Sequence, residues 1–160
     1  MKSGVRGAVA ALLMAIPAVA SAASDIAMHR DPGCGCCEKW AAQVRQQRGR
    51  KVPIVNDANR AVFQRSVGVP AALTSCHTAI IDGIAFEGHV PIADMKRALA
   101  QHSKGISGLA VAGMPVGSPG METLGTEGQA FDVVAFGLAG RRVYAHTYSA
   151  IPVPVRAPEA

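Results

Sequence analysis

Cys34-Gly35-Cys36-Cys37-Glu38-Lys39-Trp40 contains three of the four cysteines of the chain, and the fourth, Cys76, is followed directly by His77. Two cysteines that are neighbours in sequence close almost no loop, and loop closure is where a disulfide gains stability in the chain-entropy model. Thiolates are the soft ligands that favour Cu(I), Zn(II) and iron–sulfur clusters. The spacing therefore favours metal or redox chemistry over two structural disulfides.

The cysteines lie where a predicted strand leads into a predicted helix. Residues 25–30 form a short, partly alternating run, and Asp31-Pro32-Gly33 ends it. From Cys37 to Val44 the apolar residues follow helical spacing, and Gly49 is suited to the position after the last helical turn. The start of a helix stabilises anions, so we expect this position to lower the pKa of a thiol.

The apolar patterns after Gly49 predict five further elements of a mixed α/β domain. They are a strand at 52–55, a helix capped at 56 or 57 that runs to about 67, a hairpin of strands at 78–82 and 84–87, and a helix that begins near Pro91. The order βαβα-ββ-α resembles the thioredoxin fold. In that fold the segment before the third strand lies against the start of the first helix, so Cys76 and His77 should meet the other cysteines.

The C-terminal third predicts a loop and an added hairpin. Residues 105–128 are rich in Gly, Pro and Ser without periodicity, so we expect an irregular segment that is functional or disordered. Strands at 131–136 and 142–148 flank a Gly-rich turn. The predicted organisation is a signal peptide at 1–22, a thioredoxin-like metal-binding domain at 23–148 and a Pro-rich flexible tail at 149–160.

The N-terminus has the pattern of a secretory signal peptide. Lys2 and Arg6 precede the apolar run Ala8–Ala20, and Ala20-Ser21-Ala22 is a small-residue cleavage site. The apolar run is too short to span a bilayer, and no later segment is long and apolar enough. We therefore expect export to the periplasm and no membrane insertion after cleavage.

The composition argues against nucleic-acid binding. The formal net charge is +5, but the basic residues are scattered and aromatic residues make up only 4% of the chain. No stacking platform therefore accompanies the one basic cluster, at 45–51. The sequence also has no phosphate-binding loop, no Gly-x-Ser-x-Gly elbow and no spacing typical of paired catalytic carboxylates.

Several motifs resemble, in order, those of the CopG-type family of small periplasmic, thioredoxin-like metal-binding proteins linked to copper resistance. The resemblance covers about residues 26–148 and rests on 34–40, 68–70, 75–79, 87–91, 108–111 and 113–122. It implies copper bound by Cys34, Cys36 and Cys37 together with the Cys76-His77 pair, and Cu(I)/Cu(II) redox chemistry. The chain departs from the family pattern at Ala112, where a proline is expected, and at residues 30–33.

Three more residues are candidate metal ligands. His89 follows the predicted hairpin, and Met114 and Met121 lie in the Gly-rich loop. Thioethers suit Cu(I), but methionines also fill gaps in a core, and His89 could instead cap the third helix. His77 could ligate the metal, support a ligand or bond to nearby backbone. We expect packing or surface roles for Met28, Met95, His29, His102 and His146.

We expect a copper-resistance protein that holds Cu(I) in a cysteine-thiolate site. A thiolate can bridge two metals, so the site could hold more than one copper, and it could interconvert Cu(I) and Cu(II). This describes a metal-binding protein rather than a conventional enzyme, with a copper oxidoreductase left open. The expected partners are copper ions and other periplasmic copper-handling proteins.

Other functions remain open for the same cysteines. Cys34 and Cys37 form a Cys-x-x-Cys, the redox signature of thioredoxins, although a third thiol between them invites scrambling. A structural zinc site ranks lower, because copper exceeds zinc in intrinsic affinity at a generic site. A structural disulfide between Cys37 and Cys76, or inert buried thiols, would be the least functional alternatives.

Overall fold

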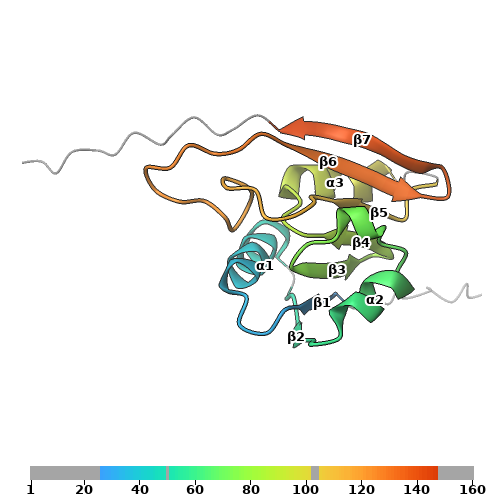
Figure 1. Ribbon diagram of the computed structural model, residues 1–160, viewed down its shortest axis with the longest axis horizontal. Coiled ribbons are helices and arrows are strands. Elements are labelled where there is room, and N and C mark those ends of the chain that lie inside the picture. The colour runs from blue at the N-terminus through green and yellow to red at the C-terminus, as the bar shows by residue number, and fades with distance from the viewer. Residues whose placement is uncertain (1–25, 50, 102–104, 148–160) are drawn as a thin grey trace, which may run out of the picture.

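The computed structural model describes residues 26–49, 51–101 and 105–147 of the 160-residue chain. The expected signal peptide, the tail at 149–160 and His102 lie outside the described residues. The described part is a mixed α/β fold in which one seven-stranded sheet is packed against helices (Figure 1). Among the described residues, no helix combines the length and apolar character needed to cross a bilayer.

The sheet has the strand order β2-β1-β3-β4-β5-β6-β7. The strands are β1 (Ala27–Arg30), β2 (Ile54–Asn56), β3 (His77–Ile81), β4 (Ile84–Glu87), β5 (Gly108–Ala110), β6 (Phe131–Gly137) and β7 (Gly140–Thr147). Strand β1 pairs parallel to β2 and antiparallel to β3, and β3 pairs antiparallel to β4. The α-helices are α1 (Gly35–Arg48), α2 (Arg60–Ser66) and α3 (Ile92–Gln101), and a short 3-10 turn spans Ala71–Leu73. The predicted order βαβα-ββ-α and the C-terminal hairpin are both observed.

Strand β5 corrects the prediction of an irregular segment at 105–128. Three residues are too few to show a periodic pattern, yet β5 pairs parallel to β4 and antiparallel to β6, so the hairpin joins the main sheet. Gly108 permits this close pairing. A Cβ on it would lie 2.4 Å from both the Ala85 carbonyl oxygen and the Phe136 ring.

Helix α2 begins later than predicted, at Arg60 rather than after a cap at 56 or 57. Asn56 belongs to β2, and the side chain of Asp57 is used in two other bonds. One oxygen accepts the Asn59 N–H at 2.8 Å, and the other lies 2.9 Å from Nδ1 of His29. Asp57 thus makes a local bond just ahead of the helix and a long-range bond to β1.

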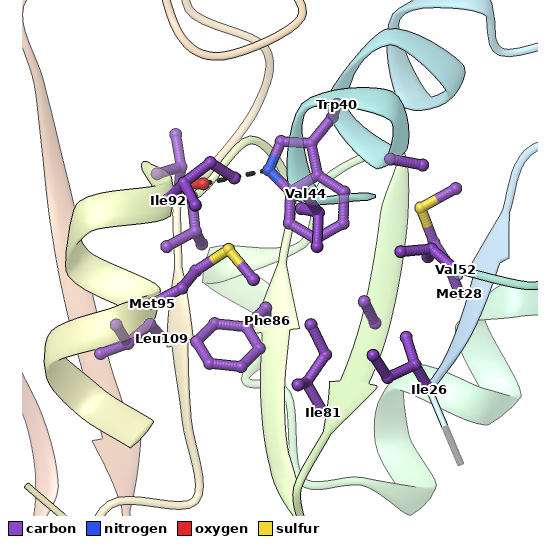
Figure 2. Close-up of a cluster of buried hydrophobic side chains, with 14 of the residues drawn as sticks. Ile26, Met28, Trp40, Val44, Val52, Ile81, Phe86, Ile92, Met95 and Leu109 are labelled. Carbon is purple, nitrogen blue, oxygen red and sulfur yellow. Dashed lines mark hydrogen bonds between the residues drawn. The ribbon is translucent and has the colours of Figure 1, made fainter. Parts of the chain in front are cut away.

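The main core lies between the sheet and the face formed by α1 and α3 (Figure 2). Trp40 and Val44 of α1 pack there with Met95 of α3, and Nε1 of Trp40 donates to the Val90 carbonyl at 3.0 Å. A smaller apolar cluster covers the other face. The packing roles predicted for Met28 and Met95 are confirmed, as are partly or largely exposed positions for His29 and His146.

Candidate metal centre

The start of α1 is held in place by a tight loop and by Arg30. Cys34 is the N-cap residue, and its sulfur accepts the N–H of Cys37 at 3.3 Å. The N–H of Cys34 donates to the Asp31 carbonyl at 3.2 Å, and Nη1 of Arg30 donates to the Cys34 carbonyl at 2.6 Å. These bonds place Cys36 and Cys37 in the first helical turn, where free N–H groups favour negative charge.

Cys76 comes from the link that enters β3. The β1–β3 register sets Arg30 opposite His77, and the N–H of Asp31 donates to the Cys76 carbonyl at 3.1 Å. Sheet pairing thus brings the Cys76-His77 segment against the start of α1. The expected convergence of these two parts of the chain is observed.

The four cysteine sulfurs lie within 4.8 Å of one another. Cys34 and Cys37 form a disulfide, whereas Cys36 and Cys76 are free. The Sγ atoms are 3.3 Å apart for Cys34 and Cys36, and 3.4 Å apart for Cys37 and Cys76. The alternative Cys37–Cys76 disulfide is therefore not the one formed. Ligation by all four sulfurs requires two-electron reduction of the Cys34–Cys37 bond.

The burial of the sulfurs is graded across the site. Cys34 and Cys36 are half-buried, whereas Cys37 and Cys76 are buried. Burial, and next to it the Cys36 thiol, raises the pKa of Cys76 to about 12. Cys76 is therefore a neutral thiol in the metal-free protein, and a metal must displace its proton to bind the sulfur.

His77 is completely buried and has a free nitrogen. Its Nδ1 lies 3.6 Å from Sγ of Cys76, and its Nε2 has no hydrogen-bond partner. The imidazole packs against Trp40 and His89, with ring centroids 4.6 and 5.0 Å away. Burial, followed by the charges of His89 and Arg60, holds the pKa of His77 well below its usual value. A neutral imidazole has one ring nitrogen with a lone pair, which makes it suited to metal binding.

His89 is oriented by the Gly-rich loop. Its Nε2 lies 3.2 Å from Sγ of Cys76, and its Nδ1 lies 2.8 Å from the Pro119 carbonyl oxygen. A carbonyl can only accept, so Nδ1 carries the proton and Nε2 presents its lone pair toward Cys76. A histidine ligand typically donates its other nitrogen in this way. Burial lowers the pKa of His89. The ring contacts the site, not α3, so the capping alternative is wrong.

Two ligand groups therefore share one residue. The first consists of the four cysteines, and the second of Cys76, His77 and His89, whose ligand atoms also lie within 4.8 Å of one another. Four thiolates form a soft site, and one thiolate with two imidazoles suits copper or zinc. Cys76 is the only residue common to both groups among those that the structure describes.

The loop at 113–122 lies across this site. Ser75 donates its hydroxyl to the Gly113 carbonyl, and Gln43 of α1 donates to Glu122 at 2.8 Å. Gly120 has positive φ, and a Cβ on it would lie 2.7 Å from the Cys36 carbonyl oxygen. The loop thus reaches the centre through its backbone. Met114 is exposed and Met121 half-buried on the same loop, and ligation by either thioether stays a prediction.

Glu87 is a supporting residue that the sequence analysis missed. It is completely buried, and its Oε1 accepts the N–H of Ser75 at 2.5 Å while its Oε2 accepts the Thr78 hydroxyl at 2.5 Å. The carboxylate thus holds the chain on both sides of Cys76-His77. Gln64 adds a third bond to Oε1 at 2.5 Å. An acid at the end of the apolar strand Ile84–Glu87 was the signal that could have revealed it.

Arg30 was also missed, and it places positive charge beside the cysteines. Its side chain is 8% exposed and is fixed by Asn56 at 2.9 Å and by Glu38 at 2.8 Å, in addition to the Cys34 carbonyl. The guanidinium thus ties the end of β1 to Cys34 and Glu38 at the start of α1. Its position among the residues that depart from the family pattern concealed this role.

Comparisons with known proteins bear on the same residues. The family model "Protein of unknown function, DUF411" matches residues 73–121, which include Cys76, His77 and His89. Two solved structures, described as forms 1 and 2 of copper resistance protein copG, are 41% and 40% identical to the chain, each with a TM-score of 0.69. The matches cover 76% and 77% of this chain and 95% and 97% of those chains. No curated protein matches it.

Proposed function

This chain belongs to the CopG-type family of copper-resistance proteins, and from that premise we propose that it binds Cu(I) through cysteine thiolates at the start of α1. The observation that carries the proposal is the convergence of four sulfurs within 4.8 Å of one another, with His77 and His89 beside them. Such a dense set of soft donors suits Cu(I) better than a hard cation.

The proposed ligands are Cys34, Cys36, Cys37 and Cys76, with the imidazoles of His77 and His89. Because a thiolate can bridge two metals and Cys76 belongs to both ligand groups, the site is suited to more than one copper ion. Met114 and Met121 are the proposed soft ligands from the loop that lies across the site. Zinc is a weaker candidate on intrinsic affinity.

We also propose that the cysteines exchange electrons with copper. Oxidation of the Cys34 and Cys37 thiolates to their disulfide releases two electrons, which would reduce two Cu(II) ions to Cu(I). The reverse direction would return two Cu(II) ions and the reduced dithiol. The disulfide at these positions supports a site that can be oxidised.

The fold and the cellular location are part of the same proposal. The strand order β2-β1-β3-β4, with the cysteines between β1 and α1, supports a thioredoxin-like fold with an added hairpin. The signal-peptide pattern at 1–22 and the relation to copper-resistance proteins support a periplasmic protein. There it would receive copper ions and exchange them with other copper-handling proteins.

Copper titration of the fully reduced protein, followed by metal analysis, tests the proposal. We expect at least one tightly bound Cu(I) per chain, and loss of binding in the double variant Cys36→Ser with Cys76→Ser. His146→Asn, at an exposed position far from the proposed ligands in sequence, is the matched control. Fewer than one bound copper per chain, or unchanged binding in the double variant, would show that this is not a copper-thiolate site.

The Cys34–Cys37 disulfide supports a second candidate function, thiol–disulfide oxidoreductase. It predicts turnover in a disulfide-reduction assay that is lost in Cys34→Ser and retained in Cys76→Ser. Activity that depended equally on Cys76 would argue against a two-cysteine catalyst.

A further inference from the structure

The four sulfurs form a continuous series across the site. Sγ of Cys36 lies 3.3 Å from Sγ of Cys34, Cys34 is bonded to Cys37, and Sγ of Cys37 lies 3.4 Å from Sγ of Cys76. Both ends of the disulfide therefore contact a free thiol. This is the arrangement from which disulfides rearrange, because exchange begins with a third sulfur beside the bond.

We propose that the disulfide moves within the molecule from Cys34–Cys37 to Cys37–Cys76, which releases Cys34. The sulfur of Cys76 attacks Sγ of Cys37, a new S–S bond forms, and the Cys34–Cys37 bond breaks with its electron pair on Cys34. Because a thiolate is the attacking species, the proton of Cys76 first passes to Nε2 of His89, which lies 3.2 Å from its sulfur, and it ends on Cys34. Cys76 enters the disulfide and Cys34 becomes a thiol. The number of disulfides is unchanged, so no external oxidant or reductant is consumed.

The required movement combines a shortening with a turn of the Cys76 side chain. Because Sγ of Cys76 lies within 4.8 Å of Sγ of Cys34, the three sulfurs are not in line, and Cys76 must turn into line with the Cys34–Cys37 bond before it attacks. The Cys37 and Cys76 sulfurs must close from 3.4 Å to a bond of about 2.05 Å. The main chain of Cys76 is already set against this loop by the bond from the Asp31 N–H. Uncatalysed rearrangements of this kind take minutes to hours.

Solvent access to Cys34 and the neighbouring His89 favour this exchange over the one at the other end of the series. Attack by Cys76 releases Cys34, which is half-buried and which water can solvate as it leaves. Attack by Cys36 on Cys34 would instead release Cys37, which is completely buried. A buried leaving thiolate at Cys37 is costly, and the buried attacking thiol of Cys76 has Nε2 of His89 3.2 Å away to accept its proton, so the disulfide moves inward to Cys76.

The position of the disulfide then decides which ligands are free, a consequence that rests on the proposed copper function. With the bond at Cys34–Cys37, Cys76 remains available with His77 and His89. With the bond at Cys37–Cys76, the free thiols are Cys34 and Cys36, both half-buried and 3.3 Å apart. An oxidised chain can thus present either a buried Cys-His-His group or a dithiol near the surface.

Peptide mapping of the full, metal-free chain tests the exchange directly. Trypsin cuts after Arg30, Lys39, Arg65 and Lys96, so Cys34, Cys36 and Cys37 fall in one peptide, 31–39, and Cys76 in another, 66–96. A Cys34–Cys37 bond leaves the two peptides separate, whereas a Cys37–Cys76 bond joins them. Their masses therefore report where the bond lies, and fragmentation identifies the cysteines.

The protein is oxidised in the presence of copper and zinc chelators, incubated for hours, alkylated at acidic pH and digested. We expect both separate and joined peptides from the wild type, with Cys34 alkylated in the joined species. In Cys34→Ser we expect a Cys37–Cys76 bond in most molecules, and in the control Cys76→Ser only separate peptides. Far-ultraviolet circular dichroism establishes that the variants are folded.

A wild type that yields only separate peptides would overturn the exchange, and so would a Cys34→Ser variant in which Cys37 and Cys76 are both alkylated. A bond between Cys34 and Cys36 with Cys37 alkylated would overturn it as well. Copper titration uses the reduced protein, so either result is independent of whether the proposed copper function holds.

Discussion

On the helix side of the proposed metal centre, Cys34 caps α1 and Cys36 lies in its first turn, and both are half-buried. On the strand side Cys76 and His77 come from one segment and His89 from another, and all three are buried. The helix side is held mainly by bonds within residues 30–38. The strand side depends on groups far away in sequence. For the proposed copper function, ligands near solvent suit metal and electron exchange, and buried ligands suit retention.

The energetic consequences differ in the same way. A half-buried thiol that loses a neighbour can still be solvated, so substitutions on the helix side should cost little stability. A buried polar group that loses its partner keeps the full cost of desolvation. The following predictions test this contrast, beginning with the largest effect.

Glu87→Ala should destabilise the metal-free protein by about 3–5 kcal/mol, because it leaves buried partners on both sides of Cys76-His77 without their acceptor. Glu87→Gln keeps the shape and one acceptor oxygen, so it should cost clearly less. Denaturant unfolding followed by circular dichroism measures both. A Glu87→Ala cost below about 1 kcal/mol would mean that the strand side does not depend on this network.

Cys76→Ser should weaken Cu(I) binding more than Cys36→Ser, because Cys76 belongs to both ligand groups. The loss at Cys76 should exceed the roughly 10–100-fold that partners outside the ligand shell contribute. Competition with a Cu(I) chelator measures both affinities under reducing conditions. Equal losses at the two positions would remove the distinction between the two sides.

His77 should make the metal-free protein less stable in mild acid. Its folded pKa is lowered from the usual 6.5, so below that value the unfolded chain binds a proton that the folded chain does not. Stability from this residue is present above about pH 6.5 and falls with decreasing pH by up to about 1.4 kcal/mol per pH unit. The difference in unfolding free energy between wild type and His77→Leu, measured from pH 7 to 5, isolates the contribution.

His146→Asn serves as the control for that pH series, because His146 is largely exposed. A wild-type and a His77→Leu profile that run parallel between pH 7 and 5 would mean that His77 is not held neutral by burial.

Met114→Leu and Met121→Leu should have the smallest effects. Each keeps the side-chain volume and removes a thioether, so metal-free stability should change by less than about 1.5 kcal/mol. Chelator competition should show a loss of Cu(I) affinity of about tenfold or less for each, since thioethers are weaker donors than thiolates. Unchanged affinity in both variants would confine the site to cysteine and histidine.

The sequence made the helix side of the centre predictable because its information is local. The cysteine spacing and the buried face of α1 both depend on neighbouring residues. The convergence of Cys76-His77 with α1 could be expected only through the fold, from the order of the elements. The short strand β5 could not be predicted from the sequence, because three residues are too few to show a periodic pattern.

The supporting groups could not be predicted, because they are defined by long-range contacts. Glu87 meets Gln64 and Ser75 only after β3 and β4 pair, and His89 meets Pro119 across 30 residues. The choice of disulfide partner also depends on which sulfurs packing brings into contact. Sequence spacing left Cys34–Cys37 and Cys37–Cys76 as alternatives.

Trp40 is the single tryptophan of the chain, and its place in the core gives the protein an intrinsic optical reporter. The indole is completely buried, is fixed by its bond to the Val90 carbonyl and lies against the His77 ring. All ultraviolet emission from tryptophan therefore originates within a few ångströms of the centre. Unlabelled protein should report the arrival of a quenching ion, or a change at His77, through the brightness of this one fluorophore.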